Sequence, residues 1–299
     1  MGVSKSFGKI RALVDVSFTV RNGEVVGYVG LNGAGKTTTI KIAVGVLPPD
    51  KGDVLIDGYS ITSDKKKASW RIGWVPELPI FETEFSAIDY FVYQAGYQGY
   101  SRGEARRLGV ELLTKFGLGN ALNRKLATFS HGMKKRFALA VSMINDPPNF
   151  MFDEVLSGLD PQGIAFFREL TLEFKRRGKA VLFSSHILSE VEGLADKVVF
   201  IHKGRIIGVY SIEEIKYRAS PALELTLSRV DSEVVKLLEK YGEPSIVNDR
   251  KIILRTPTAD SSMIIAELVK LGIGVLEAKR EERSLEDFFF NLIKKAEQG

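Results

Sequence analysis

Short apolar runs separated by polar turns dominate the first quarter of the chain and predict β-strands. Continuous apolar runs of this length are typical of strands buried on both faces of a parallel sheet. Glycine and aspartate in the intervening segments favour turns. The predicted strands span residues 12–20, 24–29, 52–56 and 72–75, with a turn at Asp57-Gly58.

Between residues 79 and 146 the pattern changes to that of helices. Apolar residues recur at helical spacing in 86–92 and 102–116, with polar faces between them. A third helix spans 130–144 and is closed by a segment containing two prolines. Strands and helices then alternate again to about Ser211, which predicts an α/β fold with a mostly parallel sheet.

The tail, residues 219–299, has the pattern of a separate α+β domain. Its strands and helices follow the order βαββαβ, which is typical of a small ferredoxin-like domain. We expect this domain to brace a dimer or to regulate it. The predicted strands are 223–227, 245–247, 251–255 and 273–278, the helices are 231–241 and 260–271, and a terminal helix opens at Ser284.

Residues 30–37 read Gly-Leu-Asn-Gly-Ala-Gly-Lys-Thr and fit the phosphate-loop pattern between a predicted strand and a predicted helix. Backbone N–H groups of such a turn, together with the helix N-terminus, form a cradle for nucleotide phosphates. Lys36 would reach the β- and γ-phosphates, and the Thr37 hydroxyl would ligate Mg²⁺. The alternative is a chance glycine-rich turn.

Two acidic residues follow the apolar run 149–152, which predicts a second part of the site. The carboxyl end of a parallel strand is where such sheets bind ligands. Asp153 would complete the Mg²⁺ shell, and Glu154 would polarise the attacking water. His186 ends another apolar run and is a candidate contact of the γ-phosphate, although a single histidine after a strand is more often an ordinary loop residue.

These motifs resemble, in their order, those of the ATPase subunit of ATP-binding cassette (ABC) transporters. The resemblance covers about residues 3–215. The tail also has a Leu-Glu-Asp-x-Phe segment at 285–289 similar to that of the ABC-2 type export subgroup. The matching segments are Phe7-Gly8, the phosphate loop 30–38, the signature-like 129–136, the acidic strand end 152–154, the loop 157–161 and His186.

The resemblance implies the P-loop ATPase fold and its site. The expected domain, 1–215, is RecA-like, with an antiparallel β edge and a helical subdomain inserted at about 80–146. Catalysis is expected from Glu154, His186 and Lys36, and Mg²⁺ ligation from Thr37, Glu77 and Asp153. The ATP contacts implied are Phe7 on adenine, Asn32, Gly33, Ala34, Gly35, Lys36, Thr37 and Thr38, and Ser130, His131 and Gly132 from a second copy.

Three departures from the family pattern stand out. Glu77 occupies the position of a glutamine that helps to hold Mg²⁺, so Mg²⁺ affinity or hydrolysis is expected to be retuned, with tolerated variation as the alternative. His131 replaces the first glycine of the signature pair and adds bulk and a possible hydrogen-bond donor. Only six residues precede Phe7, which indicates a minimal edge strand or a trimmed start.

Composition narrows the function further. The chain has no cysteine, which excludes disulfides and thiol catalysis, and only three histidines. No run approaches the roughly eighteen apolar residues of a membrane helix. The net charge is +5, and basic clusters such as 65–67, 134–136 and 175–177 are interpreted as solvated faces rather than a nucleic-acid site. A cytoplasmic location is expected, peripheral to the inner face of the cell membrane.

The function implied by the resemblance is ATP-driven transport, with export favoured by the tail. Two copies would sandwich two Mg-ATP molecules head to tail, and hydrolysis would open the sandwich. Separate transmembrane permease subunits would supply the pathway. The alternatives are a soluble ABC ATPase that acts outside transport and a regulatory subunit with weak hydrolysis.

Overall fold

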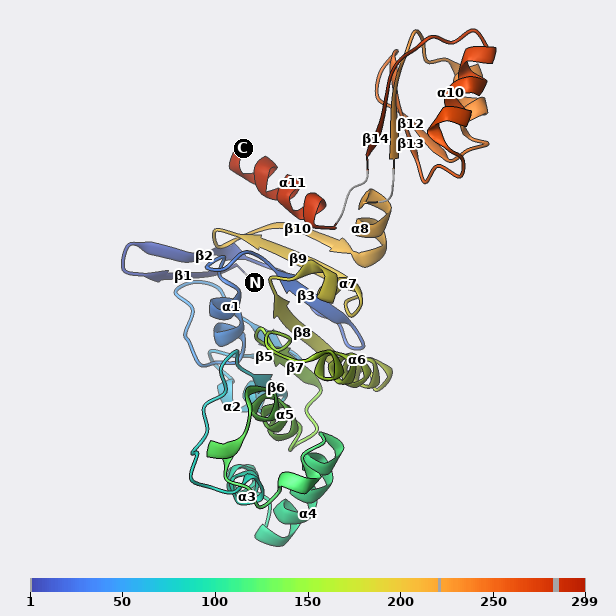
Figure 1. Cartoon of the computed structure of the whole chain (residues 1–299). Helices are drawn as coiled ribbons and strands as arrows, with labels where there is room; N and C mark the ends of the chain where they lie inside the picture. The colour runs from blue at the N-terminus through green and yellow to red at the C-terminus, as the bar shows by residue number, and fades with distance from the viewer. Residues whose placement is uncertain (1, 220–221, 282–284, 299) are drawn as a thin grey trace. The chain divides into compact units, whose positions relative to one another are not determined.

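The computed structural model (Figure 1) describes residues 2–219, 222–281 and 285–298 and divides the chain into two compact units. The first unit is Met1–Ile212 and the second is Glu213–Gly299. The sequence pattern places the same boundary a few residues later, between 215 and 219. In these described ranges, no helix has both the length and the apolar character needed to cross a membrane.

Among the described residues, six strands form the central sheet of the first unit in the order β10-β9-β3-β8-β7-β6. Neighbouring strands run parallel except β10, which pairs antiparallel with β9. The predicted mostly parallel sheet with an antiparallel edge is therefore confirmed. The strands are β3 (Val25–Val29), β6 (Ile72–Val75), β7 (Asn149–Phe152), β8 (Ala180–Ser185), β9 (Lys197–His202) and β10 (Arg205–Ser211).

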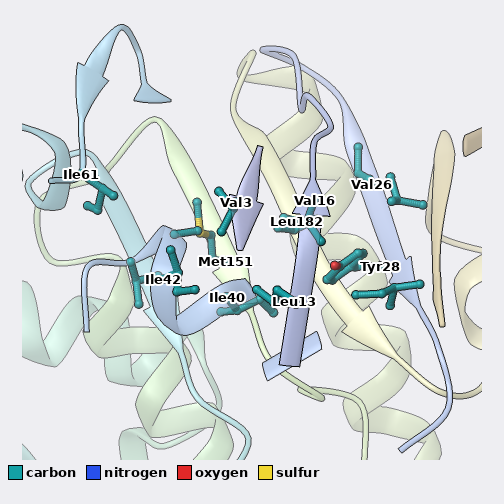
Figure 2. Close-up of a cluster of buried hydrophobic side chains, with 14 of the residues drawn as sticks. Val3, Leu13, Val16, Val26, Tyr28, Ile40, Ile42, Ile61, Met151 and Leu182 are labelled. Carbon is teal, nitrogen blue, oxygen red and sulfur yellow. The ribbon is translucent and has the colours of Figure 1, made fainter. Parts of the chain in front are cut away.

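One face of this sheet is covered by β1 (Val3–Phe7), β2 (Ile10–Val16) and α1 (Lys36–Ala43). Figure 2 shows side chains of these elements, such as Val3, Leu13 and Ile42, in one buried cluster with Tyr28 of β3 and Met151 of β7. The Tyr28 hydroxyl forms a 3.0 Å hydrogen bond with the Thr39 hydroxyl, and burial raises the pKa of Tyr28. The start of α1, where the phosphate loop ends, is thus fixed to the sheet.

The opposite face of the sheet packs on α6 (Pro161–Arg176) through aromatic side chains. Successive residues of a strand point to opposite faces, so Phe150 and Phe152 share this face. The Phe150 ring lies 4.0 Å from that of Phe174, and the Phe152 ring lies 5.3 Å from that of Phe167. Strand β7 is therefore packed on both faces, since Met151 belongs to the cluster on the other face. This packing fixes the position from which Asp153 and Glu154 follow.

The N-terminal strands differ in part from the prediction. Strand β1 pairs antiparallel with β2, and β2 ends at Val16 instead of extending to residue 20. The predicted Asp57-Gly58 turn is confirmed, because both residues have positive φ angles, 49° and 84°, as a tight hairpin requires. The strands flanking it are β4 (Leu55–Ile56) and β5 (Tyr59–Ser60), and the short helix α2 (Lys65–Ser69) follows.

Three α-helices lie between β6 and β7, as the helical periodicity predicts. Each begins at a serine that accepts a hydrogen bond from the backbone three residues later, which satisfies an N–H at the helix start. At Ser101 the bond is reciprocated by Glu104 in a capping box. The segment contains α3 (Ala87–Tyr97), α4 (Arg102–Lys115), η1 (Gly119–Ala121), η2 (Leu126–Thr128) and α5 (His131–Ser142). Outside this segment, the short helix α7 (Leu188–Glu192) follows β8.

The second unit contains an antiparallel sheet in the order β12-β13-β11-β14. The chain order β11-α9-β12-β13-α10-β14, with the first and third strands central, is the ferredoxin-like arrangement. The predicted cap Ser284 lies outside the described residues. The elements are α8 (Ile212–Ala219), β11 (Ala222–Leu227), α9 (Ser232–Leu238), β12 (Glu243–Ile246), β13 (Lys251–Arg255), α10 (Ser261–Lys270), β14 (Val275–Glu281) and α11 (Leu285–Gln298).

Candidate active site

The phosphate loop connects β3 to α1 in the way that the sequence predicts. Gly35 has a φ of 114°, and a Cβ placed there would lie 2.7 Å from Leu13 Cδ2 and 2.9 Å from the Ala12 carbonyl oxygen. Only glycine fits this position. Immediately after it, α1 begins at Lys36, whose ammonium donates to the Gly30 carbonyl oxygen at 2.6 Å. The helix N-terminus and the lysine therefore face the same space, which favours an anion.

The two acidic residues after β7 are both bonded to a serine of the neighbouring strand. The Ser184 hydroxyl donates to Asp153 Oδ1 at 2.7 Å and accepts the Glu154 backbone N–H at 2.8 Å. Asp153 and Glu154 are both buried. Glu154 has a φ of 46°, and a non-glycine residue in this region costs on the order of 1–3 kcal/mol, so its surroundings must hold it there.

The other two predicted catalytic residues, Lys36 and His186, both contact Glu154. Lys36 Nζ lies 3.2 Å from Glu154 Oε1, and His186 Nδ1 lies 2.9 Å from Glu154 Oε2. They converge because β3, β8 and β7 are neighbours in the sheet and their carboxyl ends share one edge. The side chains of Lys36 and Glu154 are almost fully buried, whereas that of His186 is 41% exposed. A carboxylate placed between two nitrogen groups can act as a proton acceptor for water.

These residues line a cavity of about 690 Å³, which is large enough for a nucleotide. Its surface is about equally polar and apolar, and it includes lysine and arginine side chains that favour a polyanion. Thr37 and Glu77, both predicted Mg²⁺ ligands, line the same cavity. The lining includes Arg11, Asn32, Gly33, Gly35, Lys36, Thr37, Thr38, Glu77, Glu154, Ser157, His186 and Lys203.

The donors offered to a metal here are oxygen atoms, which suit Mg²⁺. The residues present fit such an ion, provided that phosphate oxygens and water complete its shell, as is usual for Mg²⁺. Among the described residues, no group of three or more histidine, cysteine, aspartate or glutamate side chains could hold a metal ion alone.

Several predicted residues lie away from this cavity. Phe7, at the end of β1, is 49% exposed and is not part of the lining. Ser130 caps α5, and the neighbouring His131 ring lies beside Gly158, with Nδ1 3.0 Å from where a Cβ would stand on that glycine. Together with Gly132, these signature residues are outside the cavity that contains Lys36. Within the phosphate loop, Ala34 is buried in the core.

Two further residues of the site are missing from the sequence prediction. Ser184 could be recognised only as a hydroxyl near the end of an apolar run next to the predicted histidine. Lys135 belongs to the basic cluster 134–136, which the sequence pattern assigns to a solvated face, but it is 1% exposed. That assignment is wrong for Lys135, because its ammonium is bonded to carbonyl oxygens inside the protein.

Replacement of Ser184 by alanine tests whether this serine positions the acid pair, Asp153 and Glu154. We expect kcat for ATP hydrolysis to fall about tenfold, because the Asp153 carboxylate and the Glu154 backbone lose the hydroxyl that fixes them. The free energy of unfolding should fall by about 1–3 kcal/mol. Phosphate release and urea unfolding measure the two effects. Thr171→Ala is the control, since it removes a buried hydroxyl that donates to the Phe167 carbonyl oxygen within α6. Unchanged kcat in Ser184→Ala would contradict the assigned role.

Comparison with known proteins gives the family. The profile of the family described as ABC transporter matches residues 13–157. The bacitracin transport ATP-binding protein BcrA of Bacillus licheniformis is 32% identical over 97% of this chain and 95% of its own length. The chain belongs to the ABC transporter ATP-binding protein family. The doxorubicin resistance ATP-binding protein DrrA of Mycobacterium tuberculosis (strain ATCC 25618 / H37Rv) is 33% identical, over 87% of this chain and 78% of its own length.

A solved structure supports the same assignment for this ABC transporter ATP-binding protein. It is titled as the ATP binding subunit of an ABC transporter, is 33% identical, and superposes with a TM-score of 0.67 over 73% of this chain and 90% of its own. The predicted P-loop ATPase fold is therefore confirmed. The interpretation as an ATP-hydrolysing subunit of a transporter is also confirmed, and its nucleotide is ATP.

Proposed function

We propose that this chain exports its cargo by binding and hydrolysing Mg-ATP between two copies of itself, with separate permease subunits providing the membrane pathway. The observation that carries the proposal is the contact of Lys36, Glu154 and His186 in one cavity. Export is favoured because relatives are named for bacitracin transport and doxorubicin resistance. The permease would hold the protein at the inner face of the membrane.

We propose the following roles for the predicted residues. Lys36, Thr37 and Thr38 bind the triphosphate together with Asn32 and the loop backbone. Bound Mg²⁺ would neutralise phosphate charge during transfer. Glu154 accepts a proton from the attacking water, and the imidazole of His186 orients that water and the γ-phosphate. The ligands proposed for Mg²⁺ are Thr37, Glu77 and Asp153, and the Phe7 ring is proposed to stack on the adenine base.

The signature residues act in trans in this proposal. Ser130, His131 and Gly132 start α5 and do not line the cavity of their own chain. A helix N-terminus is suited to the γ-phosphate, so a second copy would complete the site in a head-to-tail pair. Closure of the pair around ATP and its opening after hydrolysis would move the helical subdomain and, through it, the permease.

A Mg²⁺ titration of phosphate release tests the proposed site. We expect ATP turnover that requires Mg²⁺. We also expect Glu77→Gln to raise the Mg²⁺ concentration for half-maximal rate at least about tenfold, because a ligand loses its charge. Glu82→Gln, an exposed carboxylate further along the same segment, is the control. Turnover without Mg²⁺ would contradict the proposed mechanism, and an unchanged titration in Glu77→Gln would remove Glu77 from the metal site.

A further inference from the structure

Lys135 lies in the second turn of α5, five residues after the helix cap Ser130, and its side chain points into the protein. Its ammonium donates to the carbonyl oxygens of Glu154 at 2.9 Å and Val155 at 3.1 Å, and to that of Ser157. A lysine ammonium has three N–H donors, so all three are used on one short segment. That segment begins with the residue proposed as the general base.

Two hydrogen bonds from different elements hold the peptide groups of Glu154. Ser184 of β8 accepts the Glu154 N–H, while Lys135 of α5 binds the Glu154 carbonyl oxygen. Glu154 is in the left-handed region, with a φ of 46°, which a non-glycine residue keeps only when its neighbours fix it. The direction of its carboxylate toward Lys36 and His186 depends on that backbone conformation.

Packing alone does not explain why a lysine is buried at this position, because removing an ammonium from water costs free energy. Burial lowers the pKa of Lys135, and the carboxylates of Glu77, Glu154 and Glu190 act in the opposite direction. An apolar side chain of similar size would fill the same volume without desolvating an ammonium. The ammonium therefore has a role in its hydrogen bonds to the segment that starts at Glu154.

We propose that Lys135 is a positioning residue that ties the signature helix α5 to the proposed general base Glu154. The inference rests on the proposed function, because it uses the role of Glu154 given there. Ser130 and Lys135 belong to the same helix, so a displacement of the helix start against the nucleotide of a second copy displaces the ammonium too. The Glu154 peptide follows it, and the carboxylate reaches its catalytic direction only when α5 is in place.

The test compares two buried lysines by steady-state phosphate release and by equilibrium binding of a fluorescent ATP analogue. Lys135→Met keeps the length and removes all three donors. Its kcat is expected to fall between about 10- and 100-fold with nucleotide affinity within about twofold of wild type. Lys179→Met is the matched control, since Lys179 is also buried and donates to Asp146 and Pro147 before β7. Its kcat per folded molecule should stay unchanged.

Lys135→Gln provides the rescue, because an amide retains two N–H donors without charge. A kcat between those of Lys135→Met and wild type supports positioning by hydrogen bonds, and this variant carries the test if Lys135→Met fails to fold. Wild-type kcat in a folded Lys135→Met protein would overturn the inference. It would also be overturned if kcat fell in both Lys135→Met and Lys179→Met only in proportion to the fraction of each protein that is folded. Wild-type turnover in Glu154→Gln would instead refute the proposed base.

Discussion

The Glu154→Gln variant is expected to release phosphate from ATP about 10²- to 10⁴-fold more slowly than wild type, which is the usual contribution of a positioned general base. Glutamine has the same shape and keeps the hydrogen bond to Ser184 through its backbone N–H. It cannot accept the proton of the attacking water. The carboxylate contacts with Lys36 and His186 lose their charge at the same time.

Two measurements separate this effect from general damage. Nucleotide binding should persist in Glu154→Gln, so kcat falls while affinity for Mg-ATP is retained. Glu169→Gln, an exposed carboxylate on α6, should match wild type in both. If Glu154→Gln hydrolysed ATP at a rate within about tenfold of wild type, another group would have to activate the water.

Replacing Lys36 by methionine is expected to have the second large effect, a loss of nucleotide binding. Each charge-assisted hydrogen bond to a phosphate is worth about 1.5–3 kcal/mol, so the Kd for ATP should rise about 10- to 100-fold. The rate should also fall about 10²- to 10³-fold, because a cation aimed at the developing charge is lost. Equilibrium binding of a fluorescent ATP analogue and phosphate release measure the two quantities.

The matched control for Lys36→Met is Lys41→Met on the same helix. Lys41 is exposed in the last turn of α1 and does not line the cavity. Both lysines have the same side chain and lie on the same helix, but only Lys36 faces the phosphate loop. Similar losses in the two variants would mean that positive charge on α1, and not the specific contact, determines binding.

The sequence predicts the parts of the site that are contiguous in the chain. The phosphate loop is recognisable because a glycine turn, a lysine and a threonine must follow one another between a strand and a helix. Asp153, Glu154 and His186 are also recognisable, since each follows an apolar run and parallel strands share their carboxyl edge. Their convergence then follows from the strand order.

Contacts that depend on tertiary packing are not predictable in this way. Lys135 stands in a basic cluster, and only the packing of α5 against the residues after β7 takes its ammonium out of water. Ser184 binds the acid pair because β8 lies next to β7, a register that no local pattern encodes. The early end of β2 is another such case, because beyond Val16 the Ser17 hydroxyl accepts the Gly2 N–H, a contact between residues 15 positions apart.

The most direct test of the account is the mass of the Glu154→Gln protein in solution by light scattering, with and without saturating Mg-ATP. The account predicts the mass of one chain without nucleotide and of two chains with Mg-ATP, because binding without hydrolysis holds the sandwich closed. A variant that binds Mg-ATP but keeps the mass of a single chain would contradict closure of two copies around the nucleotide.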